Sequence, residues 1–148
     1  TGRREAEADG FSGGPMRTAL EPGEILTAIR FPVWDGNGGG GFHEIAPRKG
    51  DYALVSAAAQ IALDADGICT KAAVGVGGCA PTPLRLQAVE DALIGNRLTE
   101  SLIADAVAPV PDMIDPESGV HASADYRRRA APQLVQRALL DALSEARP

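Results

Sequence analysis

Aromatic residues are scarce in this sequence, at 4% of 148 residues, and there are only two cysteines and two histidines. Hydrophobic residues nevertheless make up 45% of the chain, which argues against disorder. A chain of this length buries a core of its own as one domain, and Ala, Val, Leu and Ile must fill that core.

An excess of positive charge is also lacking, since the formal net charge is −6. A chain of this composition lacks the excess of positive charge that binds the phosphates of a nucleic acid. No apolar run reaches the length of a membrane span, and the N-terminus lacks the basic-then-apolar order of a signal peptide. These features predict a cytoplasmic protein that contacts neither nucleic acid nor membrane.

The scarcity of Cys and His excludes most self-contained catalysis. Cys69 and Cys79 are flanked by small and apolar residues, which predicts reduced, buried thiols, with a disulfide between them as the alternative. His43 and His121 are isolated, so no catalytic triad and no metal-ligand spacing is found. We therefore expect no catalytic residue and no metal ligand.

Two carboxylate pairs remain as candidates for acid–base chemistry. Asp64 and Asp66 lie in an expected hairpin turn, and Glu90 and Asp91 in an expected helix. Solvated structural roles are the favoured interpretation for both pairs.

Several stretches predict β-strands. Residues 24–31 and 42–46 carry β-branched and aromatic residues, and the glycine-rich residues 35–41 between them predict a flexible hairpin loop. The phosphate-loop alternative for these glycines is weak, because no Lys-Ser/Thr pair follows. Residues 55–63 and 68–79 predict a hairpin around the Asp66-Gly67 turn.

The second half of the chain predicts helices. Thr82 and Pro83 favour a helix start, with the helix continuing over residues 84–94 to the Gly95-Asn96 pair. Thr99 and Ser123 are expected to cap two further helices, and Pro132 to kink or split the last one. The fold class is thus α+β, with a three- to four-stranded antiparallel sheet packed against helices.

One charged turn gathers groups suited to ligand binding. Arg48, Lys49, Asp51 and Tyr52 offer cationic donors, an acceptor and an amphipathic ring, and Gly50 permits close approach of the backbone. A solvated surface turn is the alternative, and the residues alone favour it.

The run Arg127-Arg128-Arg129 is a second charged feature, on the last expected helix. It suits an anion, a solvated helix face or a contact with a partner protein. The residues alone leave these alternatives open.

Four motifs occur in one order, and the resemblance that they carry extends over nearly all of residues 11–143. They closely resemble the C-terminal domain of the FAD-binding (medium) subunit of molybdenum hydroxylases, the carbon monoxide dehydrogenase and xanthine dehydrogenase family. The motifs are residues 18–29 (TALEPGEILTAI), 48–55 (RKGDYALV), 77–85 (GGCAPTPLR) and 121–128 (HASADYRR).

The resemblance implies that such a subunit holds FAD, which receives electrons from a molybdopterin centre through [2Fe-2S] clusters on sister subunits. It also implies that this domain contacts the flavin ring, because a protein tunes a flavin by contacts around the ring. The cofactor-binding residues implied by the resemblance are Leu26, His43, Arg48, Lys49, Gly50, Asp51 and Tyr52.

The resemblance further implies a division of the chain. Residues 1–17 are expected to be a linker or a remnant of the preceding FAD-binding domain, and residues 18–148 the C-terminal domain. The family's N-terminal FAD-binding half, with its glycine-rich flavin loops, has no match here. FAD is therefore expected to be shared with that N-terminal half.

The expected role is to cover the flavin as a component of a multi-subunit oxidoreductase that passes electrons to an external acceptor. The chain is not expected to be active alone. Its expected partners are the N-terminal half, the iron–sulfur subunit and the molybdenum subunit. The alternative is a non-catalytic docking domain for the iron–sulfur or molybdenum subunit.

Overall fold

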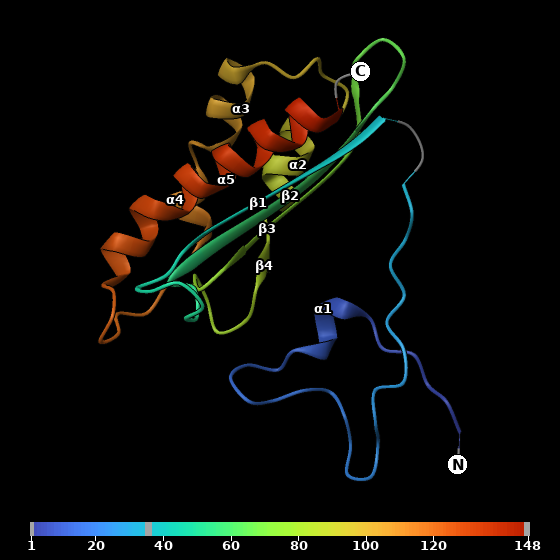
Figure 1. The fold of residues 1–148 in the computed structure, drawn as a ribbon, viewed down its shortest axis with the longest axis vertical. Coiled ribbons are helices and arrows are strands. Elements are labelled where there is room, and N and C mark those ends of the chain that lie inside the picture. The colour runs from blue at the N-terminus through green and yellow to red at the C-terminus, as the bar shows by residue number, and fades with distance from the viewer. Residues whose placement is uncertain (1, 35–36, 147–148) are drawn as a thin grey trace. The chain divides into compact units, whose positions relative to one another are not determined.

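The chain divides into two units, Thr1–Val33 and Trp34–Pro148. A computed structural model describes residues 2–34 and 37–146, and Figure 1 shows the order of the elements along the chain.

The second unit is built on a four-stranded antiparallel sheet with the strand order β1-β2-β3-β4. This confirms the predicted fold class. The strands are β1 (Asn37–Ile45), β2 (Val55–Leu63), β3 (Cys69–Gly77) and the short β4 (Leu84–Arg85).

The turn predicted at Asp66-Gly67 joins β2 to β3. Gly67 has a φ of +74°, which a glycine adopts without strain. The Asp64 carboxylate accepts hydrogen bonds from the amides of Asp66 and Ile68, at 3.0 and 2.8 Å. Asp64 therefore has a structural role, because its side chain satisfies the backbone of the turn.

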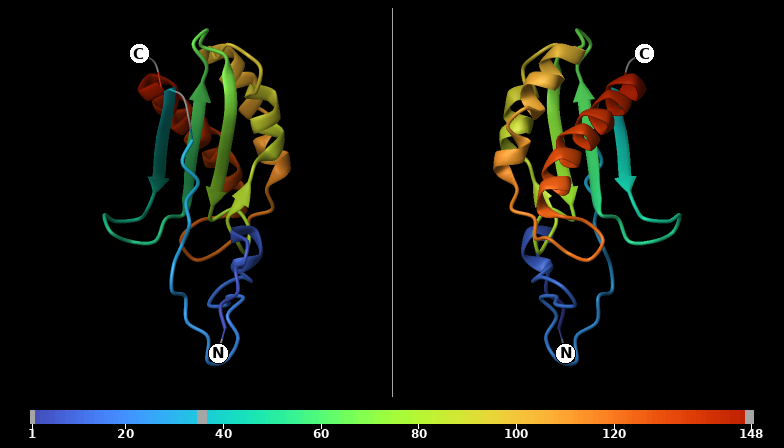
Figure 2. Two further views of the ribbon diagram at one scale, coloured as in Figure 1. Left: turned by 90° about the vertical axis from the view of Figure 1, so that its right-hand side faces the viewer. Right: turned by 90° about the vertical axis from the view of Figure 1, so that its left-hand side faces the viewer.

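Helices of the second unit cover one face of this sheet, and the left view of Figure 2 shows no helix of the described second unit over the other face. The long helix α5 (Ala124–Ala146) packs on β1 and β2, and α2 (Gln87–Leu93) packs on β3. The helices α3 (Glu100–Val107) and α4 (Val110–Met113) pack against α5.

The predicted caps of α3 and α5 are confirmed. The Leu102 amide donates to the Thr99 hydroxyl, and the Tyr126 amide donates to the Ser123 hydroxyl, both at 3.2 Å. Pro132 lies inside α5, which runs through it as one helix of 23 residues. The predicted split is wrong, because buried residues on both sides of the proline hold the helix on the sheet, whereas the alternative of a kink stays a prediction.

The core between sheet and helices is aliphatic, as the shortage of aromatic residues predicts. Alternate residues of β2 point into it, and α5 contributes a stripe of small and medium side chains. Fully buried members include Val55, Ile61, Val89, Leu93, Ile103, Leu134, Val135, Ala138, Leu139 and Ala142.

From Asn37 onward, the glycine-rich stretch is a β-strand and not the predicted flexible loop. A Cβ at Gly39 would overlap the Ala142 carbonyl oxygen, and one at Gly41 would overlap that of Ala138. The glycines therefore let α5 lie directly on β1. Asp35 and Gly36, the first two residues of the predicted loop, lie outside the described residues.

The expected helix over residues 84–94 begins later than its sequence signals indicate. Leu84 and Arg85 pair with β3 as β4, and α2 starts only at Gln87. Pairing at the sheet edge satisfies backbone groups that a first helical turn would leave free.

The first unit contains the short helix α1 (Ala8–Phe11) and an isolated bridge between Ser12 and Thr18. No residue of the described part of this unit is buried. The strand predicted over residues 24–31 is absent, since these residues make no ladder with another described segment. A strand forms only when a neighbouring strand accepts its backbone hydrogen bonds.

Candidate functional site

The charged turn forms the tip of a closed loop, residues 46–53, between β1 and β2. The Leu54 amide donates to the Ile45 carbonyl at 2.7 Å and closes the neck of the loop. At the tip, the Asp51 amide donates to the Arg48 carbonyl at 3.1 Å, and Gly50 has a φ of +86°. The loop therefore has a defined turn where the sequence places Gly50.

Arg127 of α5 fastens the neck of this loop to the sheet. Its Nη1 donates to the Leu54 carbonyl and, at 2.9 Å, to the Gly78 carbonyl. Gly78 has a φ of +75°, and a Cβ there would overlap the Leu54 carbonyl oxygen. One guanidinium thus joins the loop, the end of β3 and the start of α5.

Neither anion binding nor a solvated face, both proposed for the arginine run, describes Arg127. Its Nε is buried without a hydrogen-bond partner among the described residues. Arg128 pairs with Asp115 at 3.1 Å, whereas Arg129 is exposed. Sequence reasoning missed the role of Arg127 because its partners are backbone carbonyl groups, which every residue has and which no sequence motif identifies.

The side chains at the loop tip are presented to solvent. The Arg48 Nε and the Asp51 carboxylate form an ion pair at 3.0 Å, with Arg48 84% and Asp51 39% exposed. Lys49 is exposed, and the Tyr52 ring is 98% exposed. An exposed aromatic ring offers a flat apolar surface on which a ligand or a partner could pack.

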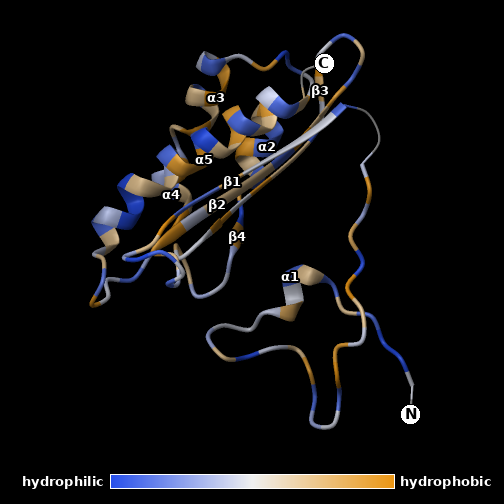
Figure 3. Cartoon of the chain, in the orientation of Figure 1, coloured by the Kyte–Doolittle hydropathy of each residue, from blue (hydrophilic) through white to orange (hydrophobic). Residues whose placement is uncertain are grey.

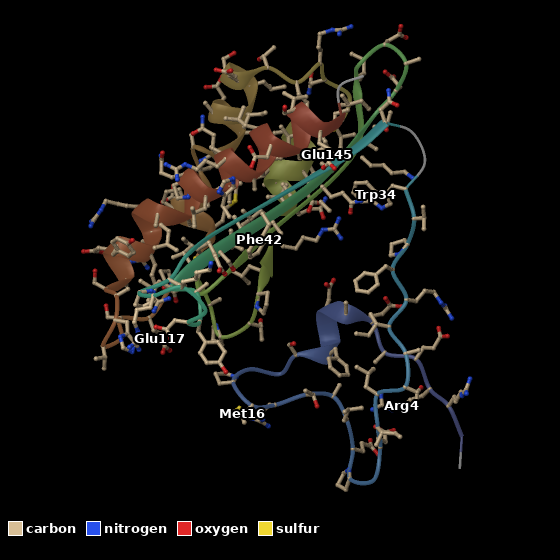
Figure 4. The ribbon with its side chains drawn as sticks, in the orientation of Figure 1. Arg4, Met16, Trp34, Phe42, Glu117 and Glu145 are labelled. Carbon is tan, nitrogen blue, oxygen red and sulfur yellow. The ribbon has the colours of Figure 1, made fainter. Side chains whose placement is uncertain are left out.

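His43 lies apart from the tip. On β1 it faces α5, where its Nε2 lies 2.8 Å from the Asp141 carboxylate. Nearby, the Gly40 amide donates to the Glu145 carboxylate at 2.6 Å, and Figure 4 shows Glu145 on α5 beside the sheet. His43 therefore ties the helix to the edge strand.

Leu26 belongs to the first unit and is 52% exposed. Within the second unit, residues 48–52 lie together at the tip of the loop, and His43 lies apart from them. The roles of all seven candidate cofactor contacts toward a flavin stay predictions.

Glu90 is not the solvated residue that the sequence predicts. It is 1% exposed, and its carboxylate accepts hydrogen bonds from the Val74 amide at 2.9 Å and from the Arg85 guanidinium at 2.7 and 2.9 Å. Asp91 is exposed and accepts a bond from Gln87. The buried Glu90 carboxylate and the half-exposed Arg85 join α2 to β3 and β4, and their pair is structural.

Both cysteines are free and buried, as predicted. Burial raises the pKa of the Cys69 thiol and of the Cys79 thiol, although the charge of Arg127 partly offsets the effect at Cys79. Raised thiol pKa values make these cysteines poor nucleophiles.

Within residues 2–34 and 37–146, no group of three or more His, Cys, Asp or Glu side chains is placed to hold a metal ion. None of the helices in the described part of the chain is long and apolar enough to cross a membrane.

The fold and the loop define an α+β domain whose sheet is covered by helices on one face and carries a closed, charged loop between its first two strands. The family model for the CO dehydrogenase flavoprotein C-terminal domain matches residues 41–142. The chain therefore belongs to this family.

Similar proteins include the 6-hydroxypseudooxynicotine dehydrogenase complex subunit alpha of Paenarthrobacter nicotinovorans. It is 36% identical over 131 residues, covering 88% of this chain and 44% of that one. The carbon monoxide dehydrogenase medium chain of Afipia carboxidovorans is 33% identical over 146 residues, covering 99% of this chain and 50% of that one.

Among solved structures, quinoline 2-oxidoreductase from Pseudomonas putida 86 matches with a TM-score of 0.87 and 34% identity. The match covers 97% of this chain and 49% of that one. The chain thus spans about half the length of the relatives it matches.

Proposed function

We propose that this chain is the C-terminal part of the FAD subunit of a molybdenum-containing hydroxylase, and that it covers the flavin held mainly by the other half of the subunit. The observation that carries the proposal is the fully exposed Tyr52 ring on a closed loop, in a domain of a flavoprotein family. An exposed aromatic side chain on an anchored loop stacks on a flat ring with little loss of conformational freedom.

The described residues suit one end of FAD, its ring system, and not its phosphates. Tyr52 offers a stacking surface, and Arg48, Lys49 and the Gly50 backbone offer donors for the polar edge of a ring. The glycine-rich residues that a phosphate cradle would need are paired in β1 and packed under α5. The diphosphate is therefore assigned to the other half of the subunit.

Bound FAD would supply the redox chemistry, accepting electrons and passing them to an external acceptor. The part of this chain is to exclude water from one side of the ring and to place positive charge near it. The Arg48 Nε pairs with the Asp51 carboxylate at 3.0 Å, so Lys49 leaves the tip with net positive charge, which would favour negative charge on a bound ring.

Molybdopterin and [2Fe-2S] clusters are assigned to partner subunits. The proposed partners are the N-terminal FAD-binding half, the iron–sulfur subunit and the molybdenum subunit. The alternative of a non-catalytic docking domain has less support, because Arg127 bonds within the chain and Arg128 pairs with Asp115.

The test is a titration of FAD, followed by quenching of flavin fluorescence, into this chain mixed with the unmatched half of the Afipia carboxidovorans medium chain. Covering half of a tyrosine side chain of ~200 Å² at ~25 cal/mol per Å² is worth about 2.5 kcal/mol. Loss of this contact in Tyr52→Ala should therefore weaken FAD binding by up to about 70-fold.

Tyr52→Phe is the matched control, because it keeps the ring, and it should bind FAD within about threefold of the unchanged chain. A stable complex of the two chains that leaves FAD unbound would overturn the proposed function. Equal FAD affinity of the Tyr52→Ala and unchanged chains would remove Tyr52 from the site.

A further inference from the structure

The strand β1 begins with an Asn-Gly pair, Asn37 followed by Gly38. Asn37 is exposed, and Figure 3 shows hydrophilic colour where β1 begins, before the paler glycines. The side-chain amide of an asparagine can be attacked by the backbone nitrogen of the next residue, and a glycine there leaves the approach open because it has no Cβ. That nitrogen must be free, because a proton held in a hydrogen bond is lost less readily to solvent.

The Gly38 nitrogen lies on the open edge of the sheet. In the described sheet β1 is an edge strand, and its one neighbour is β2. The Gly40 amide donates to the Glu145 carboxylate at 2.6 Å and therefore points away from β2. Alternate residues of a strand direct their N–H groups to the same edge, so the Gly38 N–H also points away from β2. Among the described residues it has no hydrogen-bond acceptor.

The two Asp-Gly pairs that the structure describes differ in this respect, because the glycine nitrogen of each is engaged. The Gly10 amide donates to the Glu7 carbonyl at 3.2 Å, and the Gly67 amide donates to the Asp64 carbonyl at 3.0 Å. The pair at the start of β1 is thus distinguished by its free nitrogen as well as by its asparagine.

The second asparagine of the chain, Asn96, is an internal comparison. Its side-chain nitrogen donates to the Ala92 carbonyl at 3.2 Å, and the residue that follows is the bulky Arg97. Both features hinder attack on the side chain. Asn37 should therefore be the reactive asparagine of this chain.

Ring closure at Asn37 needs only a small opening of the strand. The carbonyl of Asn37 must turn so that the Gly38 nitrogen reaches the side chain, and this turn breaks the pairing of Asn37 with Leu63. That pair is the first of the ladder between β1 and β2. The ends of strands open at little cost in free energy, so the rest of the ladder can stay closed.

We propose that Asn37 is a site of spontaneous deamidation, which loosens the start of β1. The Gly38 nitrogen loses its proton to solvent and bonds to the side-chain carbonyl carbon of Asn37, and the side-chain nitrogen takes up a proton and leaves as ammonia. Water then opens the cyclic imide at either of its carbonyl groups, which gives aspartate or isoaspartate at this position. No oxidant or reductant takes part, and the reaction does not depend on the proposed function.

Isoaspartate would lengthen the backbone before Gly38, in a segment that is tightly packed. A Cβ at Gly39 would overlap the backbone of α5, and the Gly40 amide is held by Glu145 of the same helix. A longer backbone cannot keep these contacts with α5 and also the pairing of Asn37 with β2. The modification therefore loosens the start of β1.

The test is peptide mapping by mass spectrometry after the full chain has been kept in mildly alkaline buffer. The peptide that contains Asn37 should gain the mass difference between a hydroxyl and an amino group, and hydroxylamine, which cleaves cyclic imides, should cut the chain after Asn37. Gly38→Ala should slow the mass gain by at least about tenfold, because its Cβ crowds the attacking nitrogen. The fold has room for that Cβ, since its nearest neighbour is the Ile61 carbonyl oxygen at 3.7 Å.

The rate at Asn37 in the folded chain should lie within about tenfold of the rate in urea, because only the strand end must open. A larger slowing would show that β1 protects Asn37 and would overturn the proposal. Equal rates in Gly38→Ala and the unchanged chain, or a mass gain at Asn96 as fast as that at Asn37, would overturn it too.

Amide hydrogen exchange tests the effect on β1, with the isoaspartate form separated by chromatography. The amides of Gly39 and Gly40 should exchange at least about tenfold faster in that form. Asn37→Asp adds the charge without the longer backbone and should change this exchange by less than about threefold. Unchanged exchange in the isoaspartate form would overturn the loosening of β1, and equal acceleration in Asn37→Asp would overturn the role of the longer backbone.

Discussion

Replacing Arg127 with glutamine should open the neck of the loop without unfolding the domain. Arg127 Nη1 donates to two carbonyl groups, those of Leu54 and Gly78, and the guanidinium is partly buried. A hydrogen bond from a charged group contributes about 1.5–3 kcal/mol. Since Arg127 is not fully buried and glutamine keeps one donor group, we expect a net loss of about 2 kcal/mol from closure of the neck.

The Leu54 amide reports this closure directly, because it donates to the Ile45 carbonyl across the neck. A loss of about 2 kcal/mol should speed its hydrogen exchange by about 30-fold. The amide of Ile61, a buried residue of β2 with a strand on either side, should change by less than about threefold, because it exchanges through opening of the core.

Arg129→Gln is the matched control, since Arg129 is an exposed arginine two residues further along α5. It should leave the exchange of the Leu54 amide unchanged. Unchanged Leu54 exchange in Arg127→Gln would refute the anchoring role of Arg127. Equal acceleration at Leu54 and Ile61 would show that Arg127 supports the whole domain and not the loop in particular.

Three further predictions concern the packing and charge of the two units. Gly41→Ala should lower the free energy of unfolding by about 2–3 kcal/mol in urea denaturation, because its Cβ would overlap the backbone of α5. Gly40→Ala, whose Cβ has room, should change that free energy by less than about 0.5 kcal/mol, and equal effects would contradict the close packing. Glu90→Gln should cost about 2–3 kcal/mol in the same assay, because it breaks a buried pair with a half-exposed arginine, whereas Asp91→Asn should be nearly neutral. The hydrogen bond from Arg4, followed by the backbone hydrogen bond from Glu21, lowers the pKa of Glu24 from 4.5 to about 2. The pair should therefore persist as the pH falls through 4.5 and be lost near pH 2, and a carboxyl NMR titration with a midpoint near 4.5 would argue against it.

The loop illustrates how far the sequence leads. The order of Arg48, Lys49, Gly50, Asp51 and Tyr52 is enough to single out the tip, because short polar turns with glycine have local signals. The neck has no such signal, because it depends on Arg127, 73 residues away from Leu54, bonding to a backbone carbonyl. Side-chain contacts with carbonyl groups do not constrain the identity of the residue that supplies the carbonyl.

The sequence alone determined the elements whose cause is local. Caps at Thr99 and Ser123, the turn at Gly67 and the aliphatic core follow from the nature of the residues and their near neighbours. Resemblance of four ordered motifs was enough to identify the family, which the match over residues 41–142 confirms.

Only the tertiary structure decided the elements that depend on a distant neighbour. The glycines of β1 form a strand on which α5 lies directly. Glu90 can be buried because its carboxylate pairs with Arg85 and accepts a hydrogen bond from the Val74 amide. Residues 24–33 have the pattern of a strand but lack a partner, so they form none here. Local sequence sets which conformations are favourable, whereas burial and backbone pairing depend on what the folded chain places alongside.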